Sequence, residues 1–451
     1  MVKHRHGQRH GREVGREVLA PLLALSGWCA FASYLIVQAR AGPVIGWNDS
    51  AVYSAVASKP LWSHAFWVAP RPPLTPLLIK LVGSSSAFTT AQAVIGALSW
   101  GFLAWTVGRL APVGWRRVGA TWATLAFATT LPITLWNRSV LSESLSMSLL
   151  ALVFAGGIWT SRRPTWPRVA TTAVACLCLA ATRDSEVWTV AMLGAAVVVW
   201  AVTRRSATQR VAVLAGCLLA AVVVTGWGTL ASHRSTEVVG DVYVVRIFPY
   251  PERVAWFAAH GMPQQHRIDQ LATSMPPAPH TAKTVTIAPD DPAFGPLRRW
   301  ITTRGTGTYL LWLATHPWYV VTEPLQRPER SFNFYRGDLA DYAATSNPMI
   351  SPLTPVLWPS LLGLDVMAAV AIALGARSGA WRQPAWRAVA VLAAIGIPAM
   401  LIAWHGDGQE VTRHTVEGFA ELRLGVWILL VIGLVGSRVA SAGTHEATTG
   451  R

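Results

Sequence analysis

The chain has 451 residues, of which 52% are hydrophobic and 13% are charged, and its formal net charge is +16. Soluble globular proteins carry about 25% charged residues, so this composition excludes an ordinary soluble domain and favours a polytopic membrane protein. The positive charge does not indicate nucleic-acid binding, because it is concentrated in loops that fall on one side of the predicted membrane segments.

Ten apolar segments are predicted to span a membrane, since a crossing needs about 20 apolar residues. In chain order they are residues 18–38, 87–108, 118–136, 140–159, 169–182, 187–203, 211–231, 355–376, 388–404 and 421–437. The first is longer than the apolar region of a signal peptide, so we expect it to be a membrane span and not a cleaved signal. Two other segments, 73–83 and 306–322, are short or interrupted by proline, and we expect interfacial or re-entrant helices there.

Charged residues are divided unequally between the two sides of these segments. The loops 109–117, 160–168, 203–210 and 377–387 contain arginines and no acid. With ten crossings, these loops and both termini fall on one side, which the positive-inside rule makes cytoplasmic. The other side receives nearly all the acids, so we expect the functional site at the extracytoplasmic surface of a cell membrane.

The predicted fold is all-α and multi-pass, with about ten transmembrane helices and an extracytoplasmic loop domain. The expected parts are a basic cytoplasmic tail at 1–17, a transmembrane core at 18–231 with a first extracytoplasmic loop at 39–86, an extracytoplasmic loop region at 232–354, C-terminal transmembrane helices at 355–438 and a cytoplasmic tail at 439–451. The region 232–354 contains many aromatic and β-branched residues, which predicts a small folded domain or cap.

Asp49 is a lone carboxylate after the first segment, in WNDSAVYSAVAS, with Tyr53 one helical turn later. It could be a helix cap, because Asn-Asp-Ser precedes an apolar helix. It could also be a general base, or a ligand for a metal that assists a leaving group. These interpretations are compatible, since a base at a helix start would be well fixed.

Three further residues stand out near segment ends. Glu143 lies in the first turn of the fourth segment, where a carboxylate either faces a cavity or partner, or suits the helix N-terminus. Arg71 is the only charge near the bend RPPLTPLL and could be an interfacial anchor. Arg183 ends the fifth segment on the acid-rich side, where it could pair with Asp184 or Glu186 or bind a phosphate.

A last polar group precedes the final segment, in AWHGDGQEVTRHTVEGF. Glu410, Arg413 and His414 would share one helical face through their spacing. A metal cluster of His405, Asp407, Glu410 and His414 is a weaker alternative, because the spacing matches no tight ligand motif. The sequence has no HExxH and no glycine-rich phosphate loop, so a nucleotide-driven mechanism has no visible support.

The order of these features resembles the GT-C superfamily of polytopic glycosyltransferases, in particular its mannosyltransferase-like, polyprenyl-phosphate-sugar-dependent branch. The features are a first-loop acid followed by a tyrosine, RPPLTPLL, a span that opens with LSESL, a span that ends in arginine, and a late E-x-x-R-H. The resemblance implies many transmembrane helices, an extracytoplasmic active site, and transfer of a sugar from a polyprenyl phosphate to an acceptor, commonly with inversion.

By position, the resemblance makes Asp49 the catalytic base or metal-side carboxylate and Glu143 a second, donor-orienting acid. The candidate ligands of the lipid phosphate are Arg183, Arg413 and His414, and the expected substrate contacts are Tyr53, Arg71 and Glu410. Many relatives have two adjacent acids in the first loop. Here the pair is Asn48-Asp49, which argues against a two-carboxylate metal site and leaves a divalent cation as an open option.

The sequence therefore predicts a membrane glycosyltransferase that uses a polyprenyl-phosphate sugar and an extracytoplasmic acceptor, such as a cell-envelope glycan, lipid or protein. The alternatives are a transporter or flippase of lipid-linked glycans and a non-catalytic scaffold. A transporter would need polar residues near the bilayer midplane and repeat symmetry. The expected span interiors are nearly free of charge, with Asp365 as the main exception.

Overall fold

The chain folds into helices in the computed structural model, which describes residues 4–203, 209–232, 239–264, 294–326, 351–408 and 411–436. Within these ranges there is no β-strand, and a single parallel bridge joins Ile45 to Ser139. The all-α prediction is confirmed for the described residues. The bridge ties the first loop to the segment just before the fourth predicted span.

Eight helices in the described ranges are long and apolar enough to cross a membrane. They are α1 (His4–Arg40), α5 (Ser85–Gly108), α8 (Glu143–Arg162), α10 (Asp184–Thr203), α11 (Gln209–Ala231), α21 (Leu361–Ser378), α22 (Pro384–Gly406) and α23 (Val411–Gly436). A pair bent by 60°, Trp115–Ala128 and Leu131–Arg138, would be a ninth crossing if it is one span. The remaining predicted segment, 169–182, coincides with α9 (Trp166–Ala180), which is shorter.

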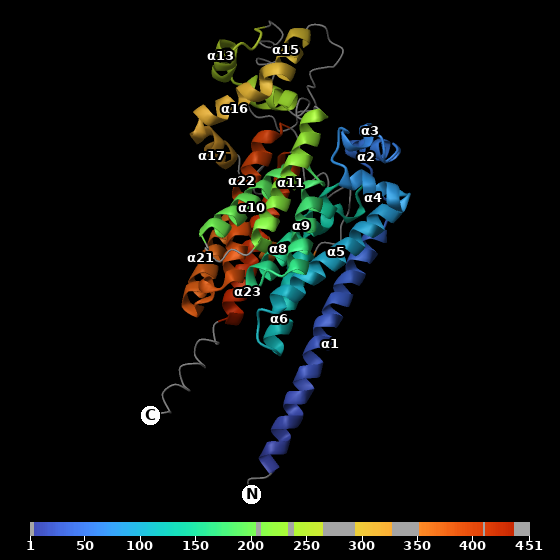
Figure 1. The fold of residues 1–451 in the computed structure, drawn as a ribbon, viewed down its shortest axis with the longest axis vertical. Helices are drawn as coiled ribbons and strands as arrows, with labels where there is room; N and C mark the ends of the chain where they lie inside the picture. The colour runs from blue at the N-terminus through green and yellow to red at the C-terminus, as the bar shows by residue number, and fades with distance from the viewer. Residues whose placement is uncertain are drawn as a thin grey trace.

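The long helices pack side by side, and the two ends of the bundle differ (Figure 1). The loops rich in arginine follow α5, α8 and α21 at one end, here called the basic end. The opposite end, here called the site end, carries the short helices α2 (Asn48–Ala57), α3 (His64–Trp67) and α4 (Leu74–Val82). An architecture of this kind fits a multi-pass membrane protein, while the assignment of the ends to the two sides of a membrane stays a prediction.

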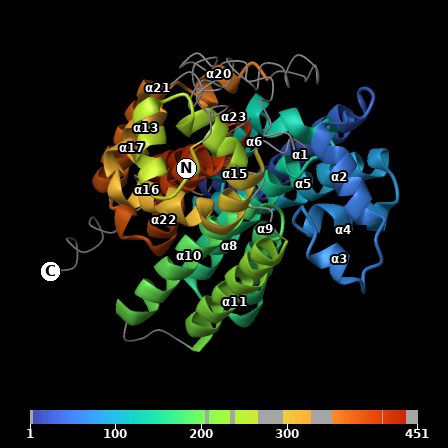
Figure 2. The same cartoon turned by 90° about the horizontal axis from the view of Figure 1, so that it is seen from above.

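A small helical unit lies above the site end, across the bundle from α2–α4 (Figure 2). It consists of η2 (Tyr243–Ile247), α13 (Pro251–Ala259), α15 (Gly295–Trp300), η4 (Ile301–Gly305), α16 (Thr306–Thr315) and α17 (Pro317–Gln326). We call this unit the cap. Its own apolar core is built around Tyr243, Phe257, Trp300 and Trp312.

The two segments with uncertain membrane placement form short helices. Residues 306–322 fall on α16 and α17, which have 10 residues each and are separated at His316. Residues 73–83 fall largely on α4, which has 9 residues. Helices of this length cannot cross a hydrocarbon core of about 30 Å, because the rise is about 1.5 Å per residue.

The last long helix corrects one sequence prediction. α23 begins at Val411, whereas the predicted span began at 421. The added turns and the start of the predicted span contain Glu417, Glu421 and Arg423, and each of these side chains is buried. The expectation of nearly charge-free span interiors is therefore wrong for α23. Asp365, the expected exception, is exposed on α21.

Candidate functional site

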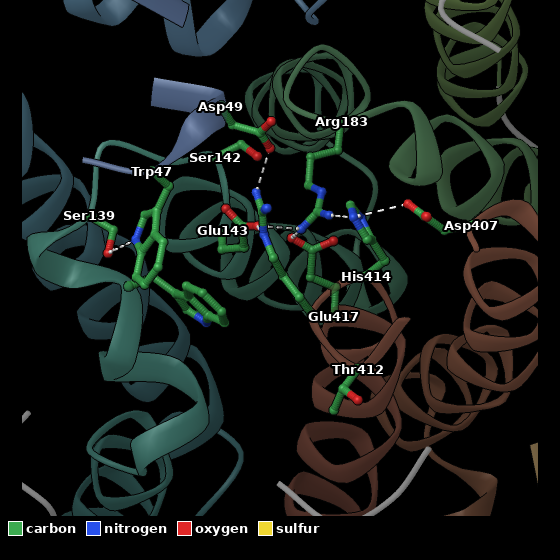
Figure 3. Close-up of polar contacts among 12 residues, drawn as sticks. Trp47, Asp49, Ser139, Ser142, Glu143, Arg183, Asp407, Thr412, His414 and Glu417 are labelled. Atoms are coloured by element: carbon green, nitrogen blue, oxygen red, sulfur yellow. Dashed lines mark hydrogen bonds and ion pairs between the residues drawn. The ribbon is translucent and has the colours of Figure 1, made fainter. Parts of the chain in front are cut away.

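Ionisable side chains from both halves of the chain meet at the site end, in what we call the charged cluster (Figure 3). Its members are Asp49 of α2, Arg71 before α4, Glu143 at the start of α8, Arg183 between α9 and α10, Asp407 after α22, and Arg413, His414 and Glu417 of α23. Residues up to 364 positions apart are thus in direct contact.

The carboxylate of Asp49 is held by two arginines. Its Oδ1 accepts a hydrogen bond from Arg71, and its Oδ2 accepts one from Nη2 of Arg413 at 2.9 Å. Burial alone would raise the pKa of Asp49, but Arg413 and Arg71 outweigh burial and hold this pKa below its usual value. Asp49 is therefore an ionised carboxylate at neutral pH.

The start of α2 is fixed by Ser50, the residue after Asp49. The Ser50 hydroxyl accepts a hydrogen bond from the backbone N–H of Trp47 at 2.9 Å and donates one to the carbonyl of Val140 at 2.8 Å. The side chain of Asp49 is thus directed to the arginines, while its position in the first helical turn remains electrostatically favourable.

Glu143 is the fully buried centre of the cluster. Its Oε1 accepts from Nε of Arg413 and lies 3.4 Å from Nη1 of Arg183. The preceding residue, Ser142, accepts a hydrogen bond from the Tyr53 hydroxyl at 3.2 Å. A buried carboxylate is tolerated here because two guanidinium groups face it.

Arg183 connects Glu143 to the residues of α23. Its Nη1 donates to Oε1 of Glu417 at 2.8 Å, and its Nη2 lies 2.6 Å from Nδ1 of His414. Burial alone would lower the pKa of Arg183, but Glu417 and Glu143 outweigh burial and raise this pKa above its usual value. The guanidinium is therefore permanently charged, and it is held between α8 and α23.

The two acids that follow Arg183 in the sequence, Asp184 and Glu186, are not its ion-pair partners at short distance. Asp184 accepts a hydrogen bond from the Thr229 hydroxyl at 2.6 Å. Glu186 is buried and shares a hydrogen bond with Glu417. Arg183 instead pairs across the bundle with Glu143 of α8 and Glu417 of α23.

The cluster has an exposed row and a buried row. The exposed row comprises Arg71, His414, Asp49 and Asp407, whose side chains are 34%, 26%, 20% and 16% exposed. The buried row comprises Arg183, Glu417, Arg413 and Glu143, with 7%, 4%, 3% and 0%. A ligand approaching from solvent would meet an arginine–carboxylate pair and a histidine–carboxylate pair first.

The cap is fastened to this site by Arg246. Its guanidinium donates to the backbone carbonyls of Trp404 at 2.5 Å and of Asp407 at 3.0 Å, and to Oε2 of Glu323 at 3.1 Å. Burial alone would raise the pKa of Glu323, but Arg246, the Tyr319 hydroxyl and Arg253 together outweigh burial and hold this pKa below its usual value. The bond to Asp407 fixes the end of α22, from which the Asp407 side chain reaches His414.

The structure brings together most of the residues that the sequence singled out. Asp49, Glu143, Arg71, Arg183, Arg413 and His414 are in the charged cluster, and Tyr53 lies beside it. Glu410 lies outside the described residues. Sequence reasoning missed Glu417 as a site residue, although its spacing of four from Arg413 places both on one helical face.

The metal interpretation gains no support from the described part of the chain. Within it, no group of three or more histidine, cysteine, aspartate or glutamate side chains is arranged to hold a metal ion. His405 turns toward the cap, where its Nε2 lies 2.9 Å from the carbonyl of Val320. Both Asp49 oxygens are engaged by arginines instead.

Two comparisons with known proteins found no match. No protein-family model matches the chain, and no curated protein matches it significantly.

Proposed function

We propose that this chain is a GT-C-like membrane glycosyltransferase that moves a sugar from a polyprenyl-phosphate donor to an extracytoplasmic acceptor. The observation that carries the proposal is the meeting of Asp49 with Arg71 and Arg413 at the site end of an apolar helical bundle. A lipid-linked donor keeps its tail in the bilayer, so its phosphate and sugar lie at such an end.

The contacts of Asp49 support the chemistry. The acceptor hydroxyl would transfer its proton to Asp49 while its oxygen forms a bond to the anomeric carbon. The bond from that carbon to the phosphate would break, with its electron pair moving to the phosphate oxygen. Arg71 and Arg413 would stabilise the departing phosphate, because guanidinium groups bind phosphates in a bidentate manner.

The same contacts suggest an order of events. Arg71 and Arg413 pair with Asp49, which weakens it as a base. A donor phosphate would compete for these guanidiniums and release the carboxylate. Asp49 would therefore become a better base once a donor is bound, which limits proton transfer in its absence.

A transporter or flippase of lipid-linked glycans is the second candidate, favoured by the charges buried in α23. Glu421 and Arg423 lie ten and twelve residues beyond the start of the helix at Val411, about 15–18 Å along its axis. Buried charges at such depth often mark transport pathways. Arg423 has a structural partner, however, since it donates to the carbonyl of Pro359 at 3.2 Å.

The proposal is tested by giving the purified protein a panel of radiolabelled polyprenyl-phosphate sugars, with native membrane extract as acceptor. Transfer from at least one donor is expected. A parallel assay would follow movement of the same lipids across proteoliposome membranes. Movement without transfer would favour the transporter, and neither activity in folded protein would favour a scaffold.

A further inference from the structure

The two ring nitrogens of His414 have different partners, which fixes its protonation. Its Nδ1 lies 2.6 Å from Nη2 of Arg183, and a guanidinium can only donate. Nδ1 therefore accepts. Its Nε2 lies 3.0 Å from Oδ2 of Asp407, so it carries the hydrogen and donates it. The imidazole is neutral, with its acceptor nitrogen occupied by Arg183.

The described members of the charged cluster then carry one more negative than positive charge. The carboxylates are Asp49, Glu143, Asp407 and Glu417, and the guanidiniums are Arg71, Arg183 and Arg413. Glu186 adds no charge, because two carboxyl groups share a hydrogen bond only when one is protonated, and Glu417 is already paired with Arg183.

An anionic ligand would meet a site that is already negative. A phosphodiester brings one more negative charge to a place where several partners are buried, and an uncompensated charge there is costly. Among the described members of the cluster, only His414 carries an imidazole, the side chain best suited to gain a proton near neutral pH. Burial disfavours the His414 cation, and so do Arg183, Arg413 and Arg71, which face the ring, whereas Asp407 accepts a hydrogen bond from its Nε2. A phosphate that engages these guanidiniums would therefore remove their repulsion, a main obstacle to protonation.

We propose that the site binds its anionic lipid ligand together with one proton, which is taken from water by Nδ1 of His414. The ligand phosphate attracts Nη2 of Arg183, and this exchange exposes Nδ1. The proton converts His414 into a cation that still donates to Asp407 and can also donate to the phosphate. This inference rests on the proposed function, because it assumes a phosphate-linked lipid as ligand.

The experiment measures proton uptake during binding by titration calorimetry. The probe is farnesyl methyl phosphate, a phosphodiester whose own charge is constant near neutral pH. Its binding enthalpy is measured in buffers of different ionisation enthalpy, and the slope gives the protons taken up per ligand. Neutral farnesol serves as the control ligand.

The wild-type protein should take up about one proton per phosphodiester, and its affinity should rise by up to about tenfold per pH unit as pH falls from about 8 to 6. His414→Gln should bind without proton uptake and without this pH dependence, since a glutamine can keep both hydrogen bonds but does not titrate. His260→Gln, at an exposed cap position, should behave like wild type, and farnesol should show no uptake.

Each other outcome is decisive. Phosphodiester binding without proton uptake in the wild type would overturn the inference and leave the proposed function standing. Equal uptake by His414→Gln and wild type would also overturn it. Absence of phosphodiester binding at every pH, in protein that remains monodisperse, would contradict the proposed function as well.

Discussion

At the scale of single residues, the ion pairs of the charged cluster share their partners. Arg413 serves both Asp49 and Glu143, and Arg183 serves both Glu143 and Glu417. Sequence could identify most of these residues, because an isolated charge beside an apolar segment needs an explanation. It could not pair them, because their partners lie far apart in the chain. Glu417 was missed because apolar residues and glycine dominate its surroundings.

Removal of the Glu143 charge should destabilise the fold. Glu143→Gln leaves two buried guanidiniums facing a neutral amide, and breaking a buried pair costs about 3–5 kcal/mol. A lower thermal unfolding temperature in detergent is expected. The double variant Glu143→Gln/Arg413→Met should recover part of the loss, and an additive loss would contradict the pairing.

The ionised state of Asp49 sets a pH dependence. Its pKa is lower in the folded protein than in the unfolded chain, so its stabilising contribution is present above the unfolded pKa, about 3.9, and is lost as pH falls through the lower folded value. The difference in unfolding temperature between wild type and Asp49→Asn should therefore be constant from about pH 8 to 5. A difference that shrinks across this range would refute the assignment.

At the scale of elements, apolar runs located the long helices well, but they misplaced the start of α23. The hydropathy pattern left Glu417 outside the predicted span and Glu421 and Arg423 at its very start, whereas the bundle buries all three within α23. The pattern also contained no information about the close approach of α22 and α23. A Cβ on Gly418 would lie 2.7 Å from the backbone nitrogen of Met400, so only glycine fits there without a shift.

Gly418→Ala should therefore destabilise the protein by about 1–3 kcal/mol, because an added methyl group pushes two backbones apart. Gly216→Ala on α11 is the matched control, since a Cβ there meets nothing within 4 Å. Replacing a helical glycine by alanine is neutral or favourable where space permits. Equal unfolding temperatures for both variants would show that α22 and α23 do not pack as described.

At the scale of the whole molecule, the asymmetry of charge predicts an orientation. The helical bundle agrees with a multi-pass membrane protein, and the basic and site ends are separated by its length (Figure 1). In a variant with its native cysteines replaced by alanine, an impermeant maleimide should label Ser58→Cys at the site end of intact cells. It should label Gln383→Cys at the basic end only after permeabilisation, and the reverse pattern would contradict the predicted topology.

The most direct measurement of the central claim is sugar transfer by a matched pair of variants. Asp49→Asn removes the proposed base, and Asp365→Asn makes the same change at an exposed position on α21. We expect transfer from a polyprenyl-phosphate sugar to fall by at least about a hundredfold in Asp49→Asn and to stay at the wild-type level in Asp365→Asn. Undiminished transfer by a folded Asp49→Asn protein would show that Asp49 is not the base.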